Sequence, residues 1–390
     1  MMPQIQTGLE HFISTPPAWA KTARFGLLAN PASVTADFMH ARDAIHRRFP
    51  GQLKALFSPQ HGFFAEKQDN MVESAHGEDR VLGIPIYSLY GDTRWPKPYM
   101  FDDIDVLLVD LQDVGTRVYT FIYTLSYCMA AAGDHVRIVI LDRPNPIGGR
   151  RVEGNVLEPE WASFVGRFPL PMRHGMTIGE IARLFADPFG IDCDLTVIPM
   201  NGWHRDMPFS GTGLPWIPPS PNLPTPASGA VYPGQVIWEG THVSEGRGTT
   251  TPFELFGAPF IDTAELLSDL DPSDLSGVHL REALFEPTFH KWAGQVCRGF
   301  FLHVTNPDTY CPYETALRIL QAIIRRYPDQ FQWKEPPYEY NDTDLPMDLI
   351  LGSQWLRMQL EQGTPIDALK AAWTPKLTEF MAWRAACLLY

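Results

Sequence analysis

Short apolar runs, each followed at once by polar or charged side chains, recur through the first 150 residues of the chain. Continuous apolar stretches of this length, separated by helix-like segments, are typical of buried strands in a parallel sheet. The carboxyl ends of parallel strands meet at one edge of the sheet, which is where such proteins bind ligands. The pattern therefore predicts a Rossmann-like, doubly wound α/β sheet. Its five strands are expected at residues 25–29, 53–57, 84–89, 106–109 and 136–141.

The segments between and after these runs predict the remaining elements. Residues 35–49 and 121–132 have the apolar spacing of helices. The stretch 199–233 is so rich in proline that we expect a long ordered loop there rather than a strand or a helix. We therefore expect a Rossmann-like domain at 1–150 and a smaller α/β domain at 151–390. In the smaller domain, strands are expected at 195–198 and 300–304, and helices at 313–326, 347–362 and 378–389.

The charge and the cysteine content exclude several classes of function. The 390 residues carry a formal net charge of −14, whereas binding nucleic acid or an anionic membrane requires a basic surface. No signal-like segment begins the sequence and no apolar run is long enough to span a membrane, so we expect a cytoplasmic protein. The five cysteines form no Cys-x-x-Cys pair, which fits a reducing compartment and argues against a zinc–thiolate site.

Several familiar catalytic motifs are missing from the sequence. No Gly-x-Gly-x-x-Gly follows the first strand, where Asn30-Pro31-Ala32-Ser33 stands instead, so a dinucleotide cofactor is not expected despite the fold. There is also no His-Glu-x-x-His, no Gly-x-Ser-x-Gly and no P-loop. These absences remove the usual support for a metalloprotease, an α/β-hydrolase or a nucleotide hydrolase.

Two polar clusters follow predicted strands directly. In the first, Asp113 can orient a sugar hydroxyl or a catalytic histidine, and Arg117 can clamp a carboxylate. The alternative for this cluster is a local ion pair that caps the next helix. In the second, His61 and Glu66 lie in one loop, and His61 is equally compatible with a purely structural role.

A third cluster, at 238–251, contains two carboxylates, a histidine, an arginine and three glycines. A strand–turn hairpin would explain the glycines but not the density of charge. Glu239 and Glu245 can present two carboxylates to one site. Acid–base chemistry at a glycosidic bond requires such a pair.

Seven short blocks of this sequence resemble the signature blocks of the NamZ/YbbC-type exo-β-N-acetylmuramidases. The similarity runs from about Gly8 to Tyr390, with blocks at 30–31, 59–62, 110–117, 141–146, 174–177, 218–224 and 239–249. The resemblance implies a glycoside hydrolase of cell-wall recycling that releases N-acetylmuramic acid from the non-reducing end of peptidoglycan fragments. It also implies an active-site cleft between a Rossmann-like and a smaller α/β domain, an amino-sugar or muropeptide substrate, and no metal or organic cofactor.

One block departs from the family pattern where catalysis is expected. The family's second block reads Pro-Glu-His-Gly, whereas this chain has Gln60, and an amide cannot give or take a proton at neutral pH. The acid role can pass to Glu66 in the same loop, or to Glu239 or Glu245 in the facing domain. The remaining alternative is a protein that binds sugar without cleaving it. We favour a glycosidase in which Glu66 or Glu245 protonates the leaving oxygen and His61 assists.

The other polar residues of the blocks are expected to bind the sugar. Gln112 and Asp113 would hold hydroxyl groups, and Arg117 or Arg247 would pair with the lactyl carboxylate. Retaining and inverting mechanisms both remain open, because they differ in the separation of two carboxyl groups. A substrate-assisted mechanism, in which the acetamido group of the sugar is the nucleophile, also remains open. The expected substrate-binding residues are Asn30, Gln60, Gln112, Asp113, Arg117, Tyr119, Asp142, Asn145, His174, Asn222, Glu239 and Arg247.

Overall fold

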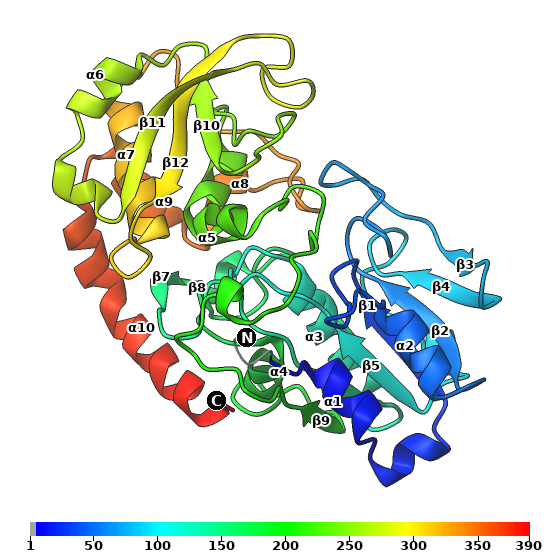
Figure 1. Cartoon of the computed structure of the whole chain (residues 1–390). Helices are drawn as coiled ribbons and strands as arrows, with labels where there is room; N and C mark the ends of the chain where they lie inside the picture. Colours follow the sequence, from blue (N-terminus) through cyan, green and yellow to red (C-terminus); the bar gives the residue numbers. More distant parts are fainter. Residues whose placement is uncertain (1–4) are drawn as a thin grey trace.

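A seven-stranded sheet forms the centre of the larger of two units (Figure 1) in a computed structural model that describes residues 5–390. The strand order is β3-β4-β2-β1-β5-β6-β9, and all neighbours are parallel except β3 and β4. All five predicted strands are present, because their apolar side chains are buried within the sheet. The strands are β1 (Phe25–Ala29), β2 (Leu53–Ser58), β3 (Gly77–Asp79), β4 (Ile84–Ser88), β5 (Val106–Asp110), β6 (Arg137–Leu141) and β9 (Leu195–Ile198).

Helices cover both faces of this sheet, so the doubly wound α/β prediction is confirmed. One face packs against α1 (Gly8–Ser14) and α2 (Ala41–Arg48), and the other against α3 (Phe121–Ala132) and α4 (Ile178–Ala186). The bounds of α3 are those that the sequence predicts. The helix expected at 35–49 begins only at Ala41, because the His40 side chain accepts the Arg42 N–H there and caps the helix.

The sheet takes its last strand from beyond the domain boundary expected at residue 150. β9 pairs with β6, and α4 precedes it, so this part of the chain belongs to the larger unit. Between β6 and α4 the chain forms a two-stranded sheet of β7 (Glu153–Val156) and β8 (Pro171–Arg173). We propose that the boundary lies instead at Pro226, the first residue of the first helix of the smaller unit.

The smaller unit is built on a three-stranded antiparallel sheet of order β10-β12-β11. Its strands are β10 (Leu255–Ala258), β11 (Val278–Phe285) and β12 (Cys297–Val304). Its helices are α5 (Pro226–Gln235), α6 (Thr263–Ser268), α7 (Pro312–Arg326), α8 (Pro346–Leu351), α9 (Gln354–Glu361) and α10 (Ile366–Cys387). Figure 1 shows α10 running alongside both units, where it contacts α4 and β7 of the larger one. The 3-10 helices are η1 (Ala18–Lys21), η2 (Pro98–Phe101), η3 (Pro159–Trp161), η4 (Phe209–Gly211), η5 (Val236–Gly240) and η6 (Pro272–Leu275).

The proline-rich segment 199–233 is a loop, with one 3-10 turn, only as far as Thr225. Beyond it α5 begins, so the prediction of a loop over the whole segment is wrong in this part. Pro226 occupies the first helical position, where a missing N–H is no loss, and Thr225 forms a capping box with Ser228. Proline therefore starts a helix here rather than preventing one.

The same loop fills the crevice between the ends of β1 and β5, where the order of the sheet reverses. Trp216 lies there with Ala32 and Gln112, and its ring packs edge-on against Phe209 at a centroid distance of 4.9 Å. About 10 Å³ of space remains in this crevice. The place where doubly wound proteins usually bind a ligand is thus occupied by the protein itself.

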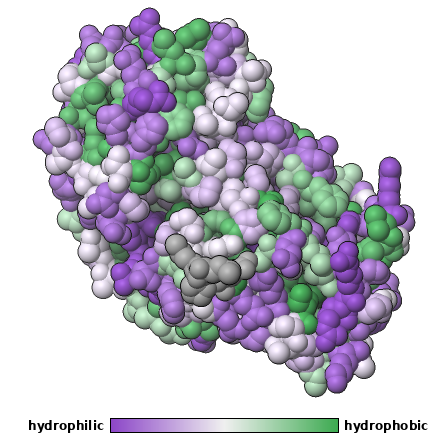
Figure 2. Space-filling model, in the orientation of Figure 1, coloured by the Kyte–Doolittle hydropathy of each residue, from purple (hydrophilic) through white to green (hydrophobic). Residues whose placement is uncertain are grey.

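Hydrophilic and hydrophobic residues are interspersed over the face of the molecule that Figure 2 shows. Within residues 5–390, the search for a helix long and apolar enough to cross a membrane finds none.

Candidate active site

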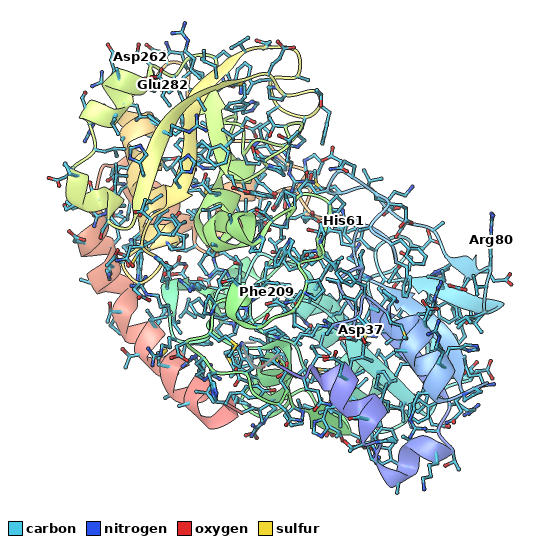
Figure 3. The ribbon with its side chains drawn as sticks, viewed as in Figure 1. Asp37, His61, Arg80, Phe209, Asp262 and Glu282 are labelled. Carbon is cyan, nitrogen blue, oxygen red and sulfur yellow. The ribbon has the colours of Figure 1, made fainter. Side chains whose placement is uncertain are left out.

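One narrow pocket lies between the two units and is lined by side chains from both. The larger unit contributes Gln60, His61, Asn70, Tyr119 and Thr120, and the smaller unit contributes Tyr232, Glu239, Arg247, Tyr338 and Glu339. In Figure 3 the label of His61 marks this junction. The pocket encloses about 40 Å³, room for no more than a few water molecules. A space of this size is smaller than a sugar ring.

A tight turn after β2 presents Gln60 and His61 to the pocket. His61 and Gly62 both have positive φ, 76° and 90°, and a glycine at the second of these positions avoids the strain that a side chain would cause. The His61 Nδ1 lies 2.8 Å from the carbonyl oxygen of Lys67. Burial lowers the pKa of His61 to about 4. The imidazole is therefore neutral at pH 7, with Nδ1 as the donor and Nε2 as an acceptor.

Glu339 is a buried carboxyl group with a pKa near neutrality. Its Oε2 accepts from the Tyr90 hydroxyl at 2.6 Å and its Oε1 from the Gln60 amide at 2.9 Å. The Thr120 hydroxyl donates in turn to Gln60 Oε1 at 2.7 Å, which fixes the orientation of the amide. Burial raises the pKa of Glu339 to about 7, and the charge of Glu239 acts in the same direction. Glu339 can therefore carry a proton at neutral pH.

The sequence analysis missed Glu339 and its neighbour Tyr338. They belong to Pro336-Pro337-Tyr338-Glu339-Tyr340, a segment without strand or helix periodicity that meets Gln60 across 279 positions of sequence. Glu339 and Tyr340 both have positive φ, 45° and 67°, which is rare for residues with side chains and concentrated at functional sites. A double proline beside two tyrosines and an acid was the signal available in the sequence.

Glu239 is the second carboxyl group of the pocket and faces a permanent positive charge. Arg247 Nη2 donates to its Oε1 at 2.6 Å, and the Tyr338 hydroxyl donates to its Oε2 at 2.7 Å. Burial acts to lower the pKa of Arg247, but the charges of Glu239 and Glu245 raise it overall. The pocket thus combines one carboxyl group that can be protonated, Glu339, with one that is paired with a guanidinium.

Glu245 lies behind the pocket rather than in it. Its buried carboxylate is 2.7 Å from Lys291 Nζ, 3.2 Å from Arg247 Nε and 3.4 Å from His290 Nδ1. Burial acts to raise the pKa of Glu245, but these three neighbours hold it at about 2. The structure therefore favours an ionised Glu245 outside the lining of the pocket, and its role as the proton donor stays a prediction.

Glu66 lies at the surface, outside the lining of the pocket. Its Oε2 accepts the Phe64 N–H of its own loop at 3.3 Å. The loop turns this side chain outward while it turns His61 inward. The structure therefore does not bring Glu66 together with the two buried carboxyl groups.

Amides expected to bind sugar hold the backbone at the sheet edge instead. Asn30 Nδ2 donates to the carbonyl of Gln112 at 3.2 Å, and Gln112 Nε2 donates to the carbonyl of Pro144 at 2.9 Å. Asn145 Nδ2 donates to the carbonyl of Met176 at 2.9 Å. Asn222, in the proline-rich loop, donates to the carbonyl of Gln68 at 2.9 Å. These residues tie loops together and do not line the pocket.

Asp142, Asp113 and His174 are also turned inward, away from the pocket. Asp142 accepts from the Thr177 hydroxyl, the Gly179 N–H and the Tyr390 hydroxyl, each at 2.8 Å, and burial raises its pKa to about 7. Asp113 Oδ2 accepts the Gly115 N–H at 2.7 Å and lies 3.4 Å from His174 Nε2. These residues do not line the pocket, and their contact with substrate stays a prediction.

Arg117 is fully buried and joins the two units through the backbone. Its guanidinium donates four hydrogen bonds of 2.8–2.9 Å, two to carbonyls near β7 and β8 and two to carbonyls at the end of α8. No hydrogen is left at Nη1 or Nη2 for a substrate carboxylate. Of the predicted site residues, the structure brings together Gln60, His61, Tyr119, Glu239 and Arg247.

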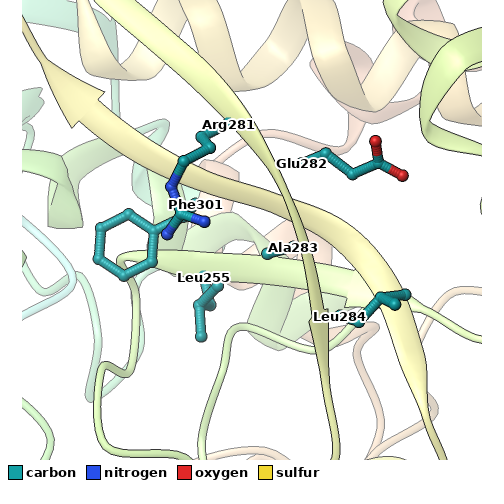
Figure 4. A pocket seen from close by; sticks show the side chains of 6 residues that line it. All are labelled: Leu255, Arg281, Glu282, Ala283, Leu284 and Phe301. Atoms are coloured by element: carbon teal, nitrogen blue, oxygen red, sulfur yellow. The ribbon is translucent and has the colours of Figure 1, made fainter.

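A second hollow lies on the three-stranded sheet of the smaller unit (Figure 4). It is lined by Leu255, Arg281, Glu282, Ala283, Leu284 and Phe301. The Arg281 guanidinium lies 5.2 Å from the centroid of the Phe301 ring and donates to His303 Nε2 at 3.1 Å. None of the predicted site residues lies there.

The fold and the site together describe a two-unit α/β protein with two buried carboxyl groups, Glu239 and Glu339, in a pocket that both units line. Family models described as the N-terminal and C-terminal parts of the exo-β-N-acetylmuramidase NamZ match residues 25–227 and 230–390. The chain belongs to this family. The two matches meet beside the start of α5, which supports the boundary proposed above.

Individual relatives are similar over the whole chain. The peptidoglycan β-N-acetylmuramidase NamZ of Bacillus subtilis (strain 168) is 42% identical over 389 residues, which cover 100% of this chain and 92% of that protein. A crystal structure of a DUF1343 family protein from Bacteroides fragilis NCTC 9343 has a TM-score of 0.89 at 32% identity and covers 99% of both chains. A second such structure from the same strain has a TM-score of 0.73 at 29% identity, covering 100% of this chain and 99% of the other.

Proposed function

We propose that this chain is an exo-β-N-acetylmuramidase, which releases N-acetylmuramic acid from the non-reducing end of peptidoglycan fragments. Family membership and 42% identity to a peptidoglycan β-N-acetylmuramidase support the activity. The observation that carries the proposal is the buried pair of carboxyl groups, Glu339 and Glu239, in a pocket shared by both units. An enzyme that detaches terminal sugars yields monosaccharides, which supports a role in the recycling of wall fragments.

Glu339 is the proton donor in this proposal. Cleavage of a glycosidic bond needs an acid that protonates the leaving oxygen, and such acids have raised pKa values. With a pKa of about 7, Glu339 is partly protonated at neutral pH and loses the proton readily. The Gln60 amide and the Tyr90 hydroxyl hold its two oxygens in place. Gln60 thus keeps a role in the site although it cannot transfer a proton itself.

Glu239 supplies the negative charge that an oxocarbenium-like transition state requires. Arg247 and Tyr338 fix both of its oxygens. The neutral His61 presents Nε2 as an acceptor for a sugar hydroxyl or a water molecule, since its Nδ1 is engaged with Lys67. The non-catalytic alternative is not favoured, because the chain belongs to the NamZ family and is 42% identical to a peptidoglycan β-N-acetylmuramidase.

Glu339→Gln tests the proposal, with Glu66→Gln beside it. Removal of a general acid costs roughly 10²–10⁴-fold in rate, so we expect that loss in kcat/KM for Glu339→Gln on an N-acetylmuramic acid–N-acetylglucosamine disaccharide. On nitrophenyl N-acetylmuramide the loss should be smaller, because nitrophenolate leaves with little help from an acid. Glu335→Gln, an exposed change in the same segment, is the matched control and should keep full activity.

A dependence on the leaving group separates loss of an acid from general damage to the fold. Equal losses on both substrates would indicate damage. If Glu66→Gln showed the loss and the leaving-group dependence while Glu339→Gln remained active, the acid would be Glu66 and the assignment of Glu339 would be overturned. Absence of turnover by the unmodified protein, with the sugar still bound, would favour the non-catalytic alternative.

A further inference from the structure

A row of aromatic rings in mutual contact lies beside Glu339, one of the residues that line the pocket. Tyr90 contacts Tyr340 and Phe164, with ring centroids 5.2 Å and 5.6 Å apart. Phe164 stacks on Tyr127 at 6.4 Å with an interplanar angle of 7°, and Tyr127 contacts Trp95 at 5.5 Å. We call these five residues the aromatic row. They come from four separate segments of the chain, so their alignment is a property of the fold and not of one local motif.

The aromatic row meets the proposed acid at its buried middle and is exposed at its two ends. The Tyr90 hydroxyl donates to Glu339, and Tyr340 follows Glu339 directly in the sequence. Tyr90 and Phe164 are 0% and 5% exposed, whereas Tyr340 is 38% and Trp95 is 45% exposed. The two ends of the row, Tyr340 and Trp95, therefore present aromatic surface to solvent.

Two arginines flank the aromatic row and carry no acidic partner. The guanidinium of Arg94 lies 3.7 Å from the centroid of Tyr340, and that of Arg167 lies 4.3 Å from the centroid of Tyr127 and 5.6 Å from that of Trp95. Across residues 5–390, neither arginine is within ion-pair distance of a carboxylate. In a protein with a net charge of −14, two such cations favour an anionic ligand.

We propose that the aromatic row is the binding surface for the leaving part of the substrate, a glycan of two or more further sugars that bears carboxylates. Sugar rings bind to exposed aromatic faces through their apolar C–H surfaces, and arginine pairs with carboxylates. The row contacts the proposed acid through Tyr90, so in this proposal the sugars beyond the scissile bond lie on its exposed rings, Tyr340 and Trp95. This inference rests on the proposed function, because the ligand is the remainder of the same substrate.

The test compares Trp95→Ala with Trp355→Ala on substrates of different length. Both tryptophans are 45% exposed, but Trp355 lies on α9, away from the aromatic row. The substrates are methyl N-acetylmuramide, which has no sugar beyond the scissile bond, and a tetrasaccharide of alternating N-acetylmuramic acid and N-acetylglucosamine. Loss of one stacking contact corresponds to roughly a 3- to 10-fold loss of kcat/KM. We expect that loss for Trp95→Ala on the tetrasaccharide alone.

The outcomes separate this inference from the proposed function. Equal effects of Trp95→Ala on both substrates, no effect on either, or the same loss in Trp355→Ala would overturn the inference while the muramidase activity stands. If the unmodified protein turned over neither substrate, the proposed function would fail. Calorimetric titration with the tetrasaccharide would then test whether the aromatic row binds glycan. A roughly 3- to 10-fold weaker Kd in Trp95→Ala would then support the aromatic row as a glycan surface, and an unchanged Kd or no binding would overturn it.

Discussion

Replacement of Gln60 by glutamate would place a second carboxyl group against the proposed acid. The Gln60 amide donates to Glu339 Oε1 at 2.9 Å, and the Thr120 hydroxyl donates to the other end of the amide at 2.7 Å. The variant Gln60→Glu can still accept from Thr120, but it presents an oxygen where the structure has a donor. The two carboxyl groups can therefore keep their contact only by sharing one proton.

The separation of the two groups sets the size of the effect. Two unit charges about 4 Å apart repel by about 4 kcal/mol at an effective dielectric constant near 20, and about 1.4 kcal/mol corresponds to one pKa unit. The full repulsion is thus worth roughly 3 units, and rearrangement of the side chains reduces it. In the unmodified protein the pKa of Glu339 is about 7. In Gln60→Glu we expect the two carboxyl groups to lose their last shared proton with a pKa at least about 1 unit higher.

The assay is the pH dependence of kcat/KM from weakly acidic to alkaline pH. Because Glu339 must be protonated to act, activity of the unmodified enzyme should fall as the pH rises through about 7. In Gln60→Glu this fall should move to higher pH, whereas the uncharged control Gln60→Met should move it much less. If the pH at which kcat/KM falls were unchanged in Gln60→Glu, or were lower than in the unmodified enzyme, the assignment of Glu339 as the titrating acid would be refuted.

Three further changes test the buried charges. Glu245→Gln leaves Lys291 buried without its carboxylate and removes one of the two carboxylates that face Arg247. It should lower the free energy of unfolding by about 3–5 kcal/mol in urea titrations at neutral pH. Because the pKa of Glu245 is held at about 2, below its ordinary value of 4.5, its contribution is lost as the pH falls through 2, and the difference between the proteins should shrink there. Arg117→Met removes four hydrogen bonds to buried carbonyls, of which those of Leu170 and Leu351 keep another donor. It should cost at least about 2 kcal/mol, measured as a lower Tm with an unchanged fold by circular dichroism. The pKa of Asp142 is raised to about 7 from 3.8, so its contribution is complete below pH 3.8 and lost as the pH rises through 7; Asp142→Asn should flatten the Tm profile in that window, and an identical profile would contradict the raised pKa.

The strands of the sheet could be predicted because each is marked by the composition of its own short stretch of sequence. An apolar run such as 106–109 is buried on both faces of a parallel sheet, so its composition alone distinguishes it from its surroundings. The bounds of α3 follow from the same contrast, since its apolar residues end at Gly133. β3, only three residues long and half-exposed, has no such contrast and was missed.

The site was predictable only in part, because polarity at a strand end has two uses. Asn30 and Asp142 looked like ligands for a sugar, but they hydrogen-bond the backbone that closes the edge of the sheet. Gln60 and His61 follow β2 with the same polarity and do reach the pocket. To tell a polar residue that binds the backbone from one that lines the pocket, one must know which loop covers each strand end. The proline-rich loop covers the ends of β1 and β5, and the sequence does not show this. Glu339 could not be paired with Gln60, because their contact spans 279 positions and no periodicity connects them.

The division of the pocket between the units constrains how this protein can have evolved. The proposed acid and its companion carboxylate come from the smaller unit, while the amide, hydroxyl and imidazole groups that orient acid and substrate come from the larger one. In the proposed mechanism each half supplies only part of the site, so exchange of one half would change the groups that surround the acid. The two halves are therefore expected to be inherited as a pair, and substitutions at Gln60 to be accompanied by changes around Glu339.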